Sequence, residues 1–412
     1  MKCLVDDDVV LARAPEGPLA AYIGMFAKSR RAQGYVRGSI HRQVLLAASF
    51  SQWLKRQGVA LGQICSEHPL RYLRCRARRV RPALGDAAAL RHLLEFLRGQ
   101  GVVRAERIPE RRTTPASRYA LSYAQYLRDV RALASATIVN YVPFICGFLE
   151  HRFGDGPVRL GRLGARDVVR CVQRLAPRLH QKRAKLLTCA LRSFLRYARY
   201  RGDVTLDLAA AVPVVANWSM PSIPRAIGAD QICQLVASLD RDTAVGRRDY
   251  AIVLLLARLG LRAGEVAFLD LEDLDWAAGL VSVRGKGGHR TALPLPPAVG
   301  EAIAAYLRDG RPGTTSRRVF LRSKAPVRGF LSQGAIGSIV RHALQRAGIQ
   351  APTCGAHQFR HAMATQMLRR GASLTEIGEI LRHRSPQTTT IYAKVDLQAL
   401  RPLALPWPGG AR

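Results

Sequence analysis

The chain is poor in acidic residues. It has 29 Asp and Glu against 64 Lys and Arg in 412 residues, which leaves a formal net charge of +35 and a sequence pI near 11.2. Only 8 of the basic residues are lysines, so a coding bias toward arginine is one explanation of the arginine content. That bias does not explain the shortage of acids. A positive field of this size predicts a polyanionic partner, with nucleic acid as the first choice.

Paired cysteines and long apolar runs are also absent. The 8 cysteines include no C-x-x-C pair, and a chain of this length needs no disulfides to hold its core, so we expect reduced thiols in a cytosol. No apolar run approaches the ~20 residues of a membrane span. The acidic start at Asp6, Asp7 and Asp8 differs from the basic start of a signal peptide. These absences predict a soluble, cytoplasmic protein without membrane contact.

Two polar stretches with proline divide the chain, at residues 110–118 and 213–224, because neither can form a continuous helix. The expected fold class is mainly α-helical with a small β-sheet, since only the last part contains strand-like alternation. The predicted organisation is a helical domain at 1–109, a second helical domain at 119–212, a linker at 213–225, a mixed α/β domain at 226–400 and a tail at 401–412.

An internal repeat links the first two segments. At a fixed offset of 98 residues, apolar positions recur at helical spacing in both. A constant offset without gaps favours two related small helical domains, although a chance match of amphipathic helices is the alternative. The matched pairs are Ile40 with Ile138, Phe50 with Phe148, Leu93 with Leu191, Phe96 with Phe194, and Leu97 with Leu195.

Arginines are dense in these two segments. Residues 71–112 hold twelve arginines against four acids, and residues 174–201 add further Lys and Arg. Any single run of this kind is as consistent with a solvated face as with a binding face. For all of these basic runs taken together, and given the positive net charge of the whole chain, contact with phosphates is the better hypothesis.

The third segment contains an arginine at a helix junction. Residues 249–259 are nearly all apolar and predict a buried helix that ends at Gly260. Arg262 follows, just before a second helix that starts near Gly264 and Glu265. Two rigid elements would hold this arginine in a position suited to bidentate contact with phosphate, and Glu265 could orient it. A surface arginine is the alternative.

A lysine lies at the tip of a predicted β-hairpin. Residues 281–283 and 291–295 alternate between apolar and polar residues, and a glycine-rich turn joins them. Lys286 on this turn would be able to swing into a site and donate a proton. Glycine-flanked lysines are also common in exposed turns.

Two basic side chains open the helix predicted for residues 357–370. His357 and Arg360 are three residues apart and therefore share a helix face, so they would reach one oxyanion together. His357 and His361 have the spacing of a zinc pair. However, Gln358 stands where a metalloprotease helix needs its Glu, so we expect no metal here.

The last predicted elements carry a histidine and a tyrosine. Ser373 and Glu376 form a capping box that starts a helix ending at His383. Pro386 then opens a short helix, and Tyr392 lies on it or just beyond it. Taken alone, a Tyr between two apolar residues is a packing residue. Val395, Leu397, Leu400 and Leu403 follow as a small apolar patch for docking on a neighbour, with fraying as the alternative.

In combination, these segments resemble the tyrosine recombinase superfamily, which includes the phage-integrase and Xer-type enzymes. The resemblance covers the whole third segment, and the second resembles the family's helical core-binding domain. Two departures stand out: Arg382, where family members often have Gly, and the additional first segment, which we read as a further core-binding-type domain. The matching segments are residues 261–265, 285–287, 357–361, 381–385 and 390–393.

The resemblance implies a reaction. Tyr392 would attack a DNA phosphate and form a 3′-phosphotyrosyl bond, with release of a 5′-hydroxyl. Arg262 and Arg360 would neutralise the non-bridging oxygens as charge develops on them. The bond energy is kept in the intermediate, so no ATP or other cofactor and no metal ion is expected.

The resemblance also implies the proton transfers. His357 would accept the phenol proton, His383 would donate a hydrogen bond to the phosphate, and Lys286 would protonate the leaving oxygen. Since Arg262, Arg360, Tyr392 and these three are all present, the expectation is an active enzyme.

The expected partners are double-stranded DNA and further recombinase subunits, either as a homo-tetramer or in a mixed assembly on paired sites. The expected role is site-specific recombination for a mobile element, and the sequence leaves integration, excision, transposition and resolution open. A type IB topoisomerase would share much of the chemistry but act as a monomer. A regulator that binds DNA without cutting it is the other alternative, and it would never yield a covalent adduct.

Overall fold

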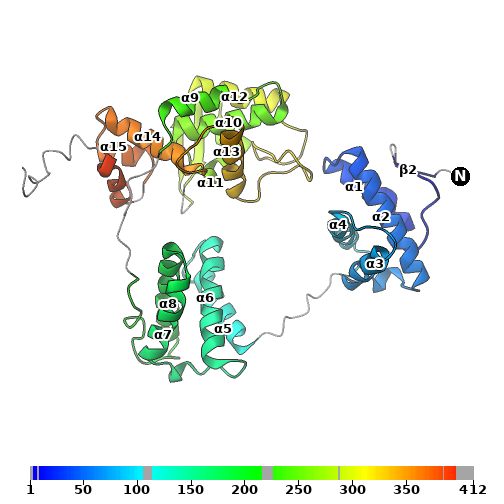
Figure 1. Cartoon of the computed structure of the whole chain (residues 1–412), viewed down its shortest axis with the longest axis horizontal. Helices are drawn as coiled ribbons and strands as arrows, with labels where there is room; N and C mark the ends of the chain where they lie inside the picture. The colour runs from blue at the N-terminus through cyan, green and yellow to red at the C-terminus, as the bar shows by residue number, and fades with distance from the viewer. Residues whose placement is uncertain are drawn as a thin grey trace, which may run out of the picture. The chain divides into compact units, whose positions relative to one another are not determined.

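A computed structural model describes residues 3–6, 9–104, 114–215, 226–285, 288–383 and 385–395. The chain divides into two compact units, Met1–Glu106 together with Ser222–Arg412, and Arg107–Pro221. Helices dominate and the β-structure is small, as predicted (Figure 1); there are two small sheets, and the larger has three strands. No helix in the described part of the chain is both long and apolar enough to cross a bilayer.

The N-terminal segment opens with a short β-hairpin, which the sequence did not predict because strands of three or four residues give too short an alternating pattern. Four helices follow, and the core between them contains Phe26, Phe50, Leu54 and Leu93. The elements are β1 (Cys3–Asp6), β2 (Val9–Leu11), η1 (Ala20–Tyr22), α1 (Ile23–Ala32), α2 (Arg37–Arg56), η2 (Leu61–Gln63), α3 (Glu67–Ala77) and α4 (Asp86–Gly99).

The unit from Arg107 to Pro221 has four main helices around its own core. Its first helix starts inside the stretch predicted as a linker, because Thr114 caps it by accepting a hydrogen bond from the Ser117 amide and Pro115 occupies the first turn. The elements are α5 (Pro115–Asp129), α6 (Ser135–Phe153), η3 (Leu160–Arg162), α7 (Ala165–Leu175), η4 (Ala176–Arg178) and α8 (Gln181–Tyr200).

The two helical segments repeat element by element. Moving the bounds of α3 by 98 residues gives those of α7, and moving α2 gives 135–154 against Ser135–Phe153 for α6. In both segments the long second helix packs on the last one, α2 on α4 and α6 on α8. The paired apolar positions are buried in both, except that Phe96 is partly buried.

The last segment holds the three-stranded sheet and the predicted hairpin. The antiparallel order is β3-β4-β5, with Val281 opposite Leu293 and Arg284 opposite Arg290. The elements are α9 (Ala229–Ala237), α10 (Ala244–Leu259), α11 (Ala263–Ala267), η5 (Leu271–Asp273), β3 (Leu274–Asp275), β4 (Leu280–Arg284), β5 (Arg290–Pro294), α12 (Pro297–Asp309), α13 (Gly334–Arg346), α14 (His357–Arg369), α15 (Leu374–Ile380), η6 (Pro386–Thr388) and η7 (Thr390–Val395).

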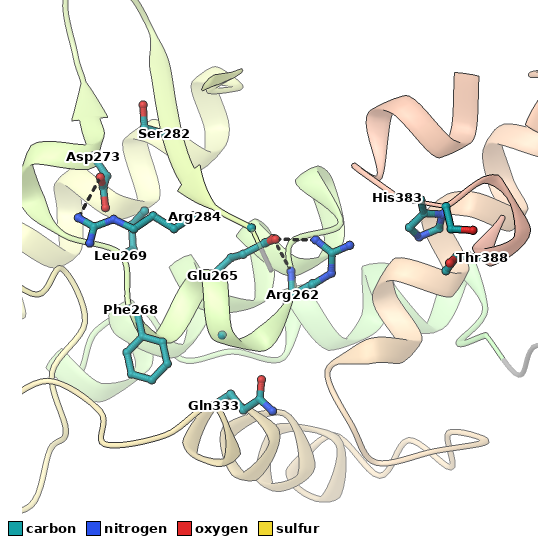
Figure 2. A pocket seen from close by; sticks show the side chains of 13 residues that line it. Arg262, Glu265, Phe268, Leu269, Asp273, Ser282, Arg284, Gln333, His383 and Thr388 are labelled. Atoms are coloured by element: carbon teal, nitrogen blue, oxygen red, sulfur yellow. Dashed lines mark hydrogen bonds and ion pairs between the residues drawn. The ribbon is translucent and has the colours of Figure 1, made fainter. Parts of the chain in front are cut away.

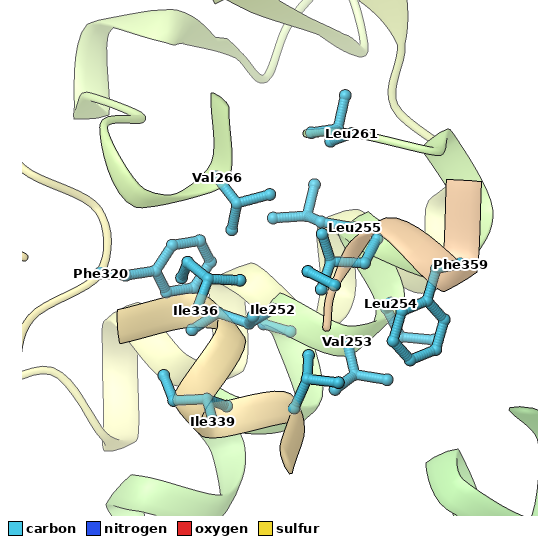
Figure 3. Close-up of a cluster of buried hydrophobic side chains, with 14 of the residues drawn as sticks. Ile252, Val253, Leu254, Leu255, Leu261, Val266, Phe320, Ile336, Ile339 and Phe359 are labelled. Atoms are coloured by element: carbon cyan, nitrogen blue, oxygen red, sulfur yellow. The ribbon is translucent and has the colours of Figure 1, made fainter. Parts of the chain in front are cut away.

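One apolar core fixes the helices that carry the candidate site. Leu254 and Leu255 of α10 lie in the same buried cluster as Ile336 of α13 and Phe359 of α14 (Figure 3). Each such side chain contributes roughly 1.5–3 kcal/mol on burial. Phe359 directly precedes Arg360, and α10 ends just before Arg262. The core therefore sets the positions of both arginines.

Glycine ends α10 where the sequence predicts it. Gly260 adopts the left-handed conformation (φ 56°), which lets the chain leave the helix and enter α11 within a few residues. Ile377 on α15 and Leu381 directly after it are buried, whereas Ile380 is 45% exposed because it lies on the edge of the buried stripe. The apolar patch beyond Tyr392 lies outside the described residues, except for the backbone of Val395.

Candidate active site

A cavity of about 710 Å³ opens where α11, the β4 strand and the turn after α15 meet. Figure 2 shows Arg262 between Glu265 on one side and His383 with Thr388 on the other. Arg284 and Gly285, at the end of β4, also line the cavity. The volume, and the presence of Arg262 and Arg284 beside Glu265 and Asp273 in the lining, suit a phosphodiester group with parts of its neighbouring sugars.

Arg262 is fixed from two sides. Its Nη1 donates to Glu265 Oε1 at 2.8 Å and its backbone amide donates to Glu265 Oε2 at 2.8 Å, so this carboxylate orients it as predicted. Its Nη2 donates to the carbonyl of Arg382 at 3.2 Å. The Arg262 side chain is 31% exposed whereas that of Glu265 is 3% exposed. Glu265 and the carbonyl of Arg382 thus fix the guanidinium of Arg262, and its exposed part reaches the cavity.

Arg360 lies next to this pair but is 1% exposed. Its Nη1 donates to the carbonyl of Gly260 at 2.8 Å, and its Nη2 donates to the carbonyl of Leu381. Burial, followed by the charges of Arg262 and Arg382, lowers the pKa of Arg360 to about 10, so it remains charged at neutral pH. His357, predicted to share its face, is exposed, and its ring lies edge-on to that of His361 with centroids 4.5 Å apart.

His383 stands at the cavity wall. Its Nδ1 is 2.8 Å from the Thr389 hydroxyl. Burial, then the charges of Arg360 and Arg262, lower the pKa of His383 from 6.5 to about 4, so the ring is neutral near pH 7. When the Thr389 hydroxyl donates to Nδ1, the proton of the neutral ring sits on Nε2 and can be donated to an oxyanion.

Tyr392 is 1% exposed and is absent from the residues that line the cavity in the described part of the chain. Its hydroxyl lies 3.0 Å from Nδ1 of His361, and its ring is nearly parallel to that of His383 at 6.4 Å. Burial raises the pKa of Tyr392, and burial with the His357 and Arg360 charges lowers the pKa of His361 to about 4. The phenol is therefore neutral and hidden behind the wall of the cavity.

Lys286 lies outside the described residues. Its hairpin is as predicted: the Gly285 amide donates to the carbonyl of His289 at 2.8 Å, and Gly288 donates to the carbonyl of Gly285 at 3.1 Å. Because Gly285 lines the cavity, the base of this turn lies at the candidate site.

Sequence reasoning gave no role to two residues of this region. The spacing of His361 from His357 indicates only that the two share a helix face, and the contact of His361 with the Tyr392 hydroxyl comes from the tertiary structure. Arg382 was noted as a departure from Gly; its guanidinium binds Glu265, at 2.9 Å between Nη2 and Oε2. A contact between residues 382 and 265 has no local sequence signal.

Comparisons with known proteins identify the family of the chain. The Phage integrase family matches residues 225–399. The integrase/recombinase y4rA of Sinorhizobium fredii is 57% identical over 412 residues, covering all of both chains. Tyrosine recombinase XerD of Mycobacterium tuberculosis is 31% identical over 306 residues, which cover 70% of this chain and 95% of that protein.

Solved structures show the same fold. A XerH site-specific recombinase, in a post-cleavage complex with its palindromic difH substrate, matches with a TM-score of 0.55 and 17% identity over 75% of this chain and 93% of its own. A lambda integrase dimer bound to a COC′ core site matches with a TM-score of 0.52 and 16% identity over 71% and 98%. The chain belongs to the phage integrase family, the tyrosine recombinases, which cleave and rejoin DNA strands.

Proposed function

We propose that Tyr392 is the nucleophile of this recombinase. Its phenolic oxygen attacks a DNA phosphorus, the bond from phosphorus to the 5′-oxygen breaks, and a 3′-phosphotyrosyl bond remains. The reverse attack by a 5′-hydroxyl of another strand rejoins the DNA. The observation that carries this proposal is the packing of Tyr392 against His383, which lines the cavity together with Arg262.

Arg262 and Arg360 supply the positive charge for the phosphate. Both are held by groups that cannot move away, a buried carboxylate for Arg262 and two backbone carbonyls for Arg360. Such pre-oriented donors stabilise charge that develops in the transition state without paying for reorganisation. His383 adds a neutral donor beside them.

The proton transfers involve three groups in this proposal. Tyr392 has to leave its contact with His361 to reach a phosphate in the cavity, because its hydroxyl is buried. His357, which is exposed on the first turn of α14, then takes the phenol proton. Lys286, on the turn that follows Gly285, gives a proton to the leaving 5′-oxygen.

The substrate of the proposed reaction is double-stranded DNA. The net charge of +35 supports it, and so do the relatives whose structures are complexes with DNA, a XerH on its difH substrate and a lambda integrase dimer on its core site. Exchange between two duplexes needs several subunits, so we include a homo-tetramer or a mixed recombinase assembly on paired sites. The protein would act in the bacterial cytoplasm, at the nucleoid.

The N-terminal segment is part of the same proposal. The match of α2 and α3 with α6 and α7 at one offset supports a duplicated core-binding domain, within the proposed organisation 1–109, 119–212, 226–400 and tail 401–412. Arg71, Arg74 and Arg78 on or next to α3 are exposed. We therefore propose that this segment contacts DNA outside the core site, for a mobile element that is integrated or transposed.

Covalent trapping tests the proposed function. The protein is incubated with nicked duplexes from the ends of its own genetic element, and denaturing gels are searched for a protein–DNA adduct. An adduct that is lost in Tyr392→Phe supports the nucleophile. Tight binding of the correct site without any adduct would instead favour a regulator. Relaxation of supercoiled DNA without joining of two sites would favour a topoisomerase.

A further inference from the structure

Helix α15 ends in a Schellman motif in which an arginine takes the place that glycine usually occupies. The amide of His383 donates to the carbonyl of Gly378 at 2.8 Å, and the amide of Arg382 donates to the carbonyl of Glu379 at 2.8 Å. Arg382 has φ 54°, in the left-handed region where a side chain strains the backbone. A non-glycine residue in this conformation costs free energy, so the contacts of the Arg382 side chain have to explain why an arginine stands here.

The side chain of Arg382 turns inward, toward the catalytic arginines. Its Nη2 binds Glu265 Oε2 at 2.9 Å, and the side chain is 10% exposed. Its Nε and Nη1 are buried without a hydrogen-bond partner among the described residues. Burial lowers the pKa of Arg382, which shows that the surroundings disfavour its charge. Burying a guanidinium with two unpaired nitrogens is unfavourable unless an anion compensates it.

The charges around this residue do not balance. Arg262 and Arg382 share the single carboxylate of Glu265, and Arg360 is close enough for both of their charges to lower its pKa. In the described part of the chain, three guanidiniums thus face one carboxylate. A glycine at position 382 would leave Glu265 to Arg262 alone, as a neutral pair. Arg382 therefore adds one positive charge directly behind the phosphate-contacting arginine.

We propose that Arg382 is a positioning residue: by sharing Glu265, it leaves the charge of Arg262 uncompensated and so strengthens the hold on the DNA phosphate to be cleaved. This inference rests on the proposed function, because it assumes that a phosphate enters the cavity. It predicts that replacing Arg382 weakens DNA binding mainly when the phosphate at the cleavage position is charged. It also predicts that the size of this loss depends on Glu265.

The test measures binding, so that it does not depend on cleavage. Tyr392→Phe is combined with Arg382→Gly, and each protein is titrated with two duplexes that differ at the cleavage position: one has the natural phosphodiester, the other an uncharged methylphosphonate. We expect Arg382→Gly to weaken binding of the natural duplex on the order of tenfold and binding of the methylphosphonate duplex much less. Equal losses on both duplexes, or no loss on either, would overturn the inference.

Variants at the same position separate charge from backbone. Glycine and asparagine both tolerate the left-handed conformation, so Arg382→Gly and Arg382→Asn remove the charge without backbone strain. Arg382→Lys keeps the charge and should retain most of the coupling. Glu265→Gln should reduce the dependence on residue 382, because Arg262 then has no carboxylate to share and only the direct attraction of Arg382 for the phosphate remains. If Arg382→Gly has its full effect in the Glu265→Gln background, the route through Glu265 is wrong.

Failure of this inference differs from failure of the proposed function. The wild-type protein either does or does not form the covalent adduct, which decides the proposed function alone. The coupling between residue 382 and the phosphate charge is measured in the Tyr392→Phe background and decides the role of Arg382 alone.

Discussion

The proposed phosphate-binding half and the proposed nucleophile half of the candidate site differ in how far their side chains are already in place. Arg262 is clamped by Glu265 and reaches the cavity, whereas Tyr392 is 1% exposed and bound to His361. The first half follows from packing of α10, α13 and α14 in one core. The second half needs a local movement before chemistry. In the proposed mechanism, binding of the phosphate and attack on it are therefore separable steps, and we expect substitutions to affect them separately.

The largest effect is expected from Tyr392→Phe. Without the phenolic oxygen no phosphotyrosyl bond can form, so the adduct should disappear completely, while the affinity for DNA stays within about twofold because the tyrosine is buried in the free chain. Denaturing gels and binding titrations on one duplex measure both. A remaining adduct in the variant would mean that another residue attacks.

The next largest effect is expected from Arg262→Gln. Loss of an oriented donor to the developing charge should lower the cleavage rate roughly 10²–10³-fold. Single-turnover cleavage of a nicked duplex measures it. Arg258→Gln is a matched control, since Arg258 is an exposed arginine on the preceding helix. An equal loss of cleavage rate in Arg258→Gln would show that the loss comes from the lower net charge of the protein and not from the position of Arg262 in the site.

A smaller effect, in the opposite direction, is expected from His361→Phe. The change removes the hydrogen bond to the Tyr392 hydroxyl and keeps a ring in the space. A typical hydrogen bond contributes about 0.5–1.5 kcal/mol, so the freed tyrosine should form its adduct a few-fold faster. A slower rate in the variant would instead place His361 in the chemistry and blur the distinction between the two halves.

The smallest effect concerns stability at acid pH. Burial lowers the pKa of His361 and that of His383 from 6.5 to about 4, so the unfolded chain binds more protons than the folded one between these values. Stability should thus be full above pH 6.5 and fall as the pH drops toward 4, by an amount on the order of 1 kcal/mol after discounting for partial exposure.

Thermal unfolding between pH 4 and 7 measures this dependence. In His361→Phe the slope should be shallower, because one of the rings with a lowered pKa is gone. An unchanged slope would show that His361 is not the half-buried neutral ring that the structure describes. His342→Phe, a substitution of a histidine whose side chain is exposed on α13, serves as the control.

Local patterns were sufficient to predict much of this protein. Gly260 ends α10, Ser373 and Glu376 cap α15, the hairpin pairs Val281 with Leu293, and Glu265 orients Arg262. All of these depend on neighbours within a few residues or on a short turn. The hairpin at residues 3–11 was missed, because its strands are too short for a clear alternation.

The sequence by itself determined the elements, their caps and the identities of the chemical groups, because hydrophobic periodicity and turn chemistry act over short distances. Only the tertiary structure decided that Tyr392 is buried on His361, that the Gly260 and Leu381 carbonyls hold Arg360, and that Arg382 shares Glu265. These contacts join residues from 21 to 117 positions apart. They arise from the packing of whole helices, which no local pattern encodes.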